Sequence, residues 1–131
     1  MTGLDTNIVV RYLAQDDAKQ SQVATRLIEG LTREEPGMVT TVVLVETIWV
    51  MEDVYGESRE RIGAIVESLL QTRTLVVQDA EIVWRALSRF RSGRADFADC
   101  LIERTCAALD CDVTYTFDKN AARDGGMALA T

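Results

Sequence analysis

The chain has 131 residues, of which 47% are hydrophobic and 27% are charged, and its formal net charge is −7. This length and composition predict one globular domain over residues 1–131 and exclude a disordered tail. No apolar run approaches the ~20 residues of a membrane span, and the start of the chain lacks the basic and apolar regions of a secretion signal, so we expect a cytoplasmic protein without a membrane segment.

Short runs with β-strand character alternate with helical patterns along the chain. The runs cover residues 1–4, 38–41, 74–77, 112–116 and 127–130. Because helical spacing follows each of the first four, the order of elements predicts a parallel sheet with helices on both faces. The expected fold is therefore α/β, with three layers in the order α/β/α.

Three apolar stripes at helical spacing support this order. The first stripe follows Asp17, an expected N-cap with Gln20 at the third helical position, and the third follows an expected cap at Asp79. The segment 40–56 is ambiguous because its β-branched residues favour a strand, and we predict strand to about Thr41 and helix afterwards. The stripes consist of Ala24, Leu27, Ile28 and Leu31, of Ile62, Ile65, Val66, Leu69 and Leu70, and of Ile82, Val83, Ala86, Leu87 and Phe90.

Acidic residues occur where predicted strands end and predicted helices begin. Asp5 ends the first strand, and Asp118 follows the fourth. Glu46 lies one turn into the helix after the second strand, and Asp96 and Asp99 begin the helix that follows "RALSRFRSGR". Ligands bind at the carboxyl ends of parallel strands, so we expect these acids to converge there.

The chain has no histidine, and its three cysteines form no CxxC pair. Without an imidazole, Ser/His triads, Cys/His nucleophiles and two-histidine ribonucleases are excluded. A zinc site is not expected either, and we interpret the cysteines as reduced thiols. Hydrolytic chemistry in this chain must therefore depend on carboxylates and on water activated by a metal.

A cluster of carboxylates repels itself unless cations lie between them. Mg²⁺ and Mn²⁺ prefer carboxylate oxygens, and one or two such ions suit phosphodiester hydrolysis. Thr6, Asn7 and Thr116 would supply polar groups beside the acids. Two divalent ions would also offset more than half of the net charge, which weakens the objection that an acidic protein does not bind RNA.

Each acid also has a structural explanation. Asp5 and Asp96 could act as helix caps or first-turn acids, and Asp118 could be a turn residue. Glu46 and Asp99 are harder to explain in this way, because an unpaired acid within an apolar run costs several kcal/mol. A salt bridge to arginine is their best alternative.

Four arginines precede Asp96 with no acid among them. They could guide RNA toward the acids, although such a run is more often a solvated helix face. These residues are Arg85, Arg89, Arg91 and Arg94.

Four segments of the chain occur together in an order that resembles a known family. They are "GLDTNIVVRYL", "TTVVLVETIWVM", "ADFADCLIERTCAAL" and "TYTFDKNAAR", and they span nearly the whole chain. In this combination the chain resembles PIN-domain ribonucleases, specifically the VapC-type toxins of bacterial type II toxin–antitoxin systems. The resemblance implies a five-stranded parallel sheet and Mg²⁺- or Mn²⁺-dependent endoribonuclease activity. It also implies an RNA substrate such as tRNA or another structured RNA, a homodimer, and inhibition by a VapB-type antitoxin.

The resemblance implies a role for each acid by its position. Asp5 and Asp99 would be direct metal ligands, while Glu46 and Asp118 would bind metal directly or through water. Asp96 matches a position that is commonly acidic and whose role varies. The family's polar positions beside the acids correspond to Asn7 and Thr116.

Two other interpretations remain open. A receiver-type phosphoacceptor domain has the same alternation of elements, and Lys119 after the fourth strand fits it. However, Asp5 is not part of an acidic pair, and Asp79 is better explained as a cap. A catalytically inactive PIN-like binding module is the second alternative, but it would have no reason to retain the full acid set.

Overall fold

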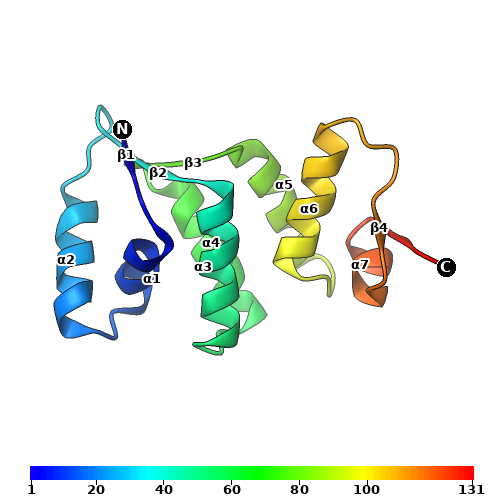
Figure 1. Ribbon diagram of the computed structural model, residues 1–131, viewed down its shortest axis with the longest axis horizontal. Coiled ribbons are helices and arrows are strands. Elements are labelled where there is room, and N and C mark those ends of the chain that lie inside the picture. Colours follow the sequence, from blue (N-terminus) through cyan, green and yellow to red (C-terminus); the bar gives the residue numbers. More distant parts are fainter. The chain divides into compact units, whose positions relative to one another are not determined.

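The computed structural model describes residues 1–131 (Figure 1). It comprises two compact units, unit 1 over Met1–Gln78 and unit 2 over Asp79–Thr131. Both units contain helices and parallel strands, so the α/β class predicted from the alternation of elements is confirmed.

Unit 1 is built around a three-stranded parallel sheet with the strand order β1-β2-β3. Gly3 lies opposite Met38, and Val39 lies opposite Val77. Helix α1 packs against α2 and α3, and α4 packs against α3 and β3. The elements are β1 (Thr2–Gly3), α1 (Thr6–Ala14), α2 (Ala18–Glu29), β2 (Gly37–Val39), α3 (Thr41–Asp53), α4 (Arg59–Gln71) and β3 (Leu75–Val77).

The helices of unit 1 begin at side chains that satisfy free backbone N–H groups. Asp17 accepts a hydrogen bond from the N–H of Gln20 at 2.8 Å, which confirms the predicted cap of α2. Thr40 accepts one from the N–H of Val43, and this explains why strand β2 ends at Val39 and α3 begins directly afterwards. The ambiguous segment is therefore mainly helical, as predicted.

Unit 2 consists of a helical pair followed by a small strand–helix–strand motif. Its elements are α5 (Ala80–Arg91), α6 (Phe97–Ala108), β4 (Tyr115–Thr116), α7 (Lys119–Asp124) and β5 (Ala128–Leu129). Helices α5 and α6 pack together, with the rings of Phe90 and Phe97 edge to face at a centroid distance of 5.9 Å. Strands β4 and β5 are parallel, with Tyr115 opposite Ala128.

Most residues of the three predicted apolar stripes face the core. The second and third stripes are buried except for Leu70 and Ile82, which are half-buried. In the first stripe Leu27 is 40% exposed, so its predicted core position is wrong. Asp79 does precede α5, but its backbone is left-handed (φ 51°) and its side chain makes no capping hydrogen bond.

The single five-stranded sheet expected from the resemblance is not what the structure has. It has a sheet of three strands, β1-β2-β3, and a separate sheet of two strands, β4-β5. Periodicity identifies the strand segments but not their partners, and strands of only two or three residues form too few ladder bonds to specify pairing strongly.

No helix in the structure is both long and apolar enough to cross a membrane. The three cysteines are free thiols, and Cys100 is buried.

Candidate functional site

Asp5 immediately precedes α1 in unit 1. Its backbone is extended (φ −78°, ψ 160°), and its carbonyl oxygen accepts hydrogen bonds from the N–H groups of Ile8 and Val9. Its carboxylate makes no capping hydrogen bond and is exposed to solvent. Asp5 therefore occupies the N-cap position while leaving its carboxylate free for another ligand.

A side-chain hydrogen bond orients Glu46 in the same unit. The hydroxyl group of Thr6, whose residue is 9% exposed, donates to Oε1 of Glu46 at 2.9 Å. Thr6 lies in the first turn of α1 and Glu46 lies on α3, and these two helices pack together. The hydrogen bond holds one carboxylate oxygen of Glu46, so Thr6 supplies the polar support for an acid that the sequence predicted.

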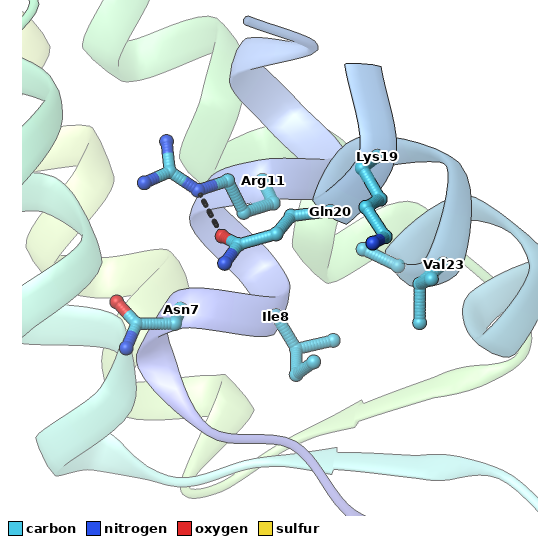
Figure 2. Close-up of a pocket in the computed structure, with 7 residues that line it drawn as sticks. Asn7, Ile8, Arg11, Lys19, Gln20 and Val23 are labelled. Atoms are coloured by element: carbon cyan, nitrogen blue, oxygen red, sulfur yellow. Dashed lines mark hydrogen bonds between the residues drawn. The ribbon is translucent and has the colours of Figure 1, made fainter. Parts of the chain in front are cut away.

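Asn7 lines a cavity of about 530 Å³ between α1 and α2. Figure 2 shows Asn7, Ile8 and Arg11 on α1, with Arg11 hydrogen-bonded to Gln20 of α2. None of the predicted acids lines this cavity. Arg11 is also paired with Asp16 at 3.1 Å. The catalytic chemistry must therefore be sought at the acids and not in the cavity.

Asp96 and Asp99 stand at the start of α6 in unit 2. Asp96 is the N-cap residue, but its side chain makes no capping hydrogen bond and is exposed. Asp99 lies in the first turn, is half-buried, and makes no hydrogen bond or ion pair. The positive end of the α6 dipole compensates in part for these two charges.

Burial raises the pKa of the Asp99 carboxyl above its ordinary value of 3.8, and the charges of Asp96 and Asp118 raise it further. An opposite charge beside Asp99 would have the reverse effect. The carboxylates of Asp96 and Asp118 therefore lie close enough to Asp99 to repel its charge.

Asp118 is the N-cap residue of α7, and its carboxylate and its backbone N–H each make a hydrogen bond. Its Oδ1 accepts from the N–H of Ala121 at 2.9 Å, so it does cap this helix. Its own N–H donates to the hydroxyl of Thr116 at 3.0 Å. Oδ2 of Asp118 has no hydrogen bond, so the residue can cap α7 and still offer an oxygen to a ligand. Thr116 acts on the backbone of Asp118 and not on an acid side chain.

The arginine run contains one residue with a clear structural role. Arg89 is paired with Glu103 at 3.5 Å, and Glu103 is only 7% exposed. Glu103 also receives two hydrogen bonds from Arg104, at 2.6 and 2.9 Å. The guanidinium of Arg89 lies where a side chain at Gly126 would otherwise sit, and Gly126 has the positive φ (78°) that glycine tolerates best.

The other three arginines lie on the surface. Arg85 is paired with Glu81 at 3.2 Å, one turn away on α5, and both side chains are exposed. Arg91 and Arg94 are exposed as well. The run is therefore partly a solvated helix face and partly a structural ion-pair network, and its role in guiding RNA stays a prediction.

The candidate acids are thus divided between the two units. Asp5 and Glu46 belong to unit 1, and Asp96, Asp99 and Asp118 belong to unit 2. No group of three acids or cysteines in the structure is close enough to hold a metal ion. In chemical terms the donors nevertheless fit a hard divalent cation, because they are carboxylate oxygens and no cationic side chain neutralises Asp5, Asp96 or Asp99.

Comparison with known proteins identifies the family of the chain. A model of the PIN domain matches residues 4–125, a range that includes all five acids. A VapC ribonuclease of Aquifex aeolicus (strain VF5) is 24% identical over 98 residues, which cover 75% of this chain and 73% of that protein. No solved structure matches the chain. Because the family model spans nearly the whole sequence and both halves of the acid set, the chain belongs to the PIN-domain family.

Proposed function

We propose that the protein is a metal-dependent endoribonuclease that acts as the toxin of a toxin–antitoxin pair in the cytoplasm. The observation that carries this proposal is the environment of Asp99. Its carboxylate is half-buried beside Asp96 and Asp118, and it forms no ion pair with a cationic side chain. An acid in such a position destabilises the fold if no interaction offsets its burial and the repulsion from its neighbours. A bound divalent cation would stabilise the charged form of this carboxylate.

The role proposed for each acid is the one that membership in the PIN-domain family implies for its position. Asp5 and Asp99 would hold Mg²⁺ or Mn²⁺, and Asp96 and Asp118 would complete the ligand set around one or two ions. Glu46, oriented by Thr6 at 2.9 Å, would position the attacking water. A bound divalent ion would supply a lower pKa for that water and a positive charge beside the phosphate oxygens.

RNA is the substrate class that membership in this family and the VapC ribonuclease relative both support. A structured RNA such as tRNA is the specific expectation. The receiver-type alternative has no support from the comparisons, since the matched family model is that of the PIN domain. The exposed arginines Arg85, Arg91 and Arg94 would contact the RNA backbone as point charges.

The proposed partner is a VapB-type antitoxin, and the proposed assembly of the toxin is a homodimer. An arginine on the antitoxin tail could neutralise the same carboxylates that hold metal, through charge-assisted hydrogen bonds. Co-expression with the product of the adjacent reading frame should give a complex that co-purifies and lacks nuclease activity. Independent purification of the two proteins would contradict this part of the proposal.

The activity itself is tested by incubating the purified protein with a pool of structured RNAs, with and without Mg²⁺ or Mn²⁺. We expect discrete internal cuts that require the added ion and disappear with excess chelator, and mapping of the new ends would identify the target. Cleavage that is undiminished in chelator would contradict metal dependence. The absence of cleavage with either ion would contradict the nuclease assignment.

A further inference from the structure

The last residue of α7 contacts the turn that leads into α6. Oδ2 of Asp124 accepts a hydrogen bond from the backbone N–H of Arg94 at 2.9 Å. The Asp124 side chain is 23% exposed and Arg94 is exposed, so this contact lies at the surface of the unit. It joins two segments of unit 2 that are 30 residues apart in the chain.

Glycine at position 93 makes the contact possible. A Cβ atom at Gly93 would lie 2.6 Å from Cβ of Asp124 and 3.0 Å from its Cγ, closer than real side-chain atoms approach. Any other residue at position 93 would push Asp124 away from the turn. The turn and the end of α7 are therefore packed directly against each other.

The position of Asp124 is unfavourable for α7 considered alone. A carboxylate at the C-terminus of a helix opposes the helix dipole, which favours cations there. The ion pair of Asp124 with its neighbour Arg123 spans 3.5 Å, and the arginine is 65% exposed, so it contributes little. The hydrogen bond to the turn is the interaction that compensates for this placement.

This contact joins the two places where the acids of unit 2 arise. Arg94 stands two residues before Asp96 and five before Asp99, at the entrance to α6. Asp118 and Asp124 bracket α7, a helix of six residues and about 9 Å in length. A helix this short moves as one body, so holding its C-terminal end also restricts the position of Asp118 at its N-terminal end.

We propose that Asp124 is a positioning residue for the metal site: by accepting the N–H of Arg94, it keeps Asp118 near Asp96 and Asp99. The inference rests on the proposed function and adds to it a residue that touches neither metal nor RNA. The positioning of Asp118 requires the hydrogen-bond acceptor of Asp124 and does not require its negative charge.

The test uses the full-length protein and two readouts, Mn²⁺ affinity by calorimetry and the rate of RNA cleavage. D124A should raise the Kd for Mn²⁺ by about tenfold or more and lower cleavage, as the loss of a ligand-orienting partner does. D124N should remain within about threefold of the wild type, because its amide oxygen can accept the same N–H. G93A should weaken Mn²⁺ binding while leaving Asp124 chemically intact.

D112A is the matched control, since Asp112 is an exposed aspartate of the same unit that makes no hydrogen bond or ion pair. It should bind Mn²⁺ as the wild type does. Wild-type affinity in D124A, or equal damage in D124N and D124A, would overturn the inference. If D124A does not fold, the pair D124N and G93A decides: the inference requires the first to bind normally and the second to bind weakly. A wild-type protein that neither binds Mn²⁺ nor cleaves RNA would instead overturn the proposed function, and the inference with it.

Discussion

Asp99 and Glu103 lie one turn apart on α6, and the fold treats these two acids in opposite ways. Glu103 is the more buried, and two arginines surround it, Arg104 at 2.6 Å and Arg89 at 3.5 Å. Asp99 is half-buried, and the charges that raise its pKa are those of the Asp96 and Asp118 carboxylates. Both acids occur in an apolar run, so their surroundings distinguish them and their sequence context does not.

The difference separates a structural acid from an acid that is available to a ligand. Burial of a charge is tolerated when the fold supplies its counterions, as it does for Glu103. Asp99 has no such counterion within unit 2, and a neighbouring carboxylate only adds to the cost. A divalent cation would supply what the fold does not, and the following changes test this distinction.

Replacement of Asp99 should have the largest effect on activity. D99N should lower RNA cleavage by about a thousandfold or more, since a bound catalytic ion contributes several kcal/mol to transition-state stabilisation. In chelator, the thermal melt of D99N should be no lower than that of the wild type, because the change removes a repelling charge. D112N serves as the control and should cleave normally. Full activity in D99N, or a large loss of stability, would make Asp99 a structural residue.

Replacement of Glu103 should have the opposite profile. E103Q should lower the free energy of unfolding by about 2 kcal/mol, because it leaves two guanidinium groups with a weakened partner. The effect is moderate since the side chains of Arg89 and Arg104 remain 32% and 27% exposed. Urea denaturation measures the loss, and cleavage per folded molecule should be unchanged. A loss of cleavage with no change in stability would place Glu103 among the catalytic acids.

Two buried threonines provide a matched pair in unit 1. T6V should cost about 1 kcal/mol and reduce cleavage, because it removes the hydrogen bond that orients Glu46. T47V should be neutral or stabilising, since the buried Thr47 hydroxyl has no hydrogen-bond partner. Denaturation and cleavage assays on both variants check this expectation. Equal effects of the two substitutions would remove the assigned role of Thr6.

The pH dependence of the metal-free protein should show the smallest effect. The pKa of Asp99 is raised above 3.8 in the folded state, so the folded protein binds the proton more tightly than the unfolded chain. The stabilisation from this proton is complete below the unfolded pKa and is lost as pH rises through the folded pKa. In thermal melts with chelator, the stability of the wild type relative to that of D99N should therefore fall as the pH rises from about 4 to about 7. An increase in the stability of the wild type relative to D99N with rising pH would contradict the raised pKa of Asp99.

Local features of the molecule were predictable because they depend on nearby residues. The cap of α2 by Asp17 follows from an aspartate and an amide three residues apart, and the structure has this hydrogen bond at 2.8 Å. The helical stripes and the order of elements follow from the spacing of apolar residues. The acids could be selected in the same way, since a carboxylate beside Phe97 and Cys100 contradicts the pattern around it.

Features that join distant segments could not be predicted. The arginine run looked uniform, yet packing of α5 against α6 assigned Arg89 to Glu103 and left Arg85 with a surface partner. The role of Asp124 could not be predicted because its partner is a backbone N–H, which every residue except proline carries. The predicted five-stranded sheet was wrong for the related reason that strand pairing depends on long-range contacts.

The α/β class and the helical segments follow from the amino-acid sequence alone, and the carboxylates proposed for the site were selected from it, because these features depend on side-chain chemistry and on spacing over one or two turns. Only the tertiary structure decided which acids have counterions and which do not, because neutralisation requires a partner brought from elsewhere in the chain. The charges that surround each acid distinguish Asp99 from Glu103, because the Coulomb energy between charges is large only at close range.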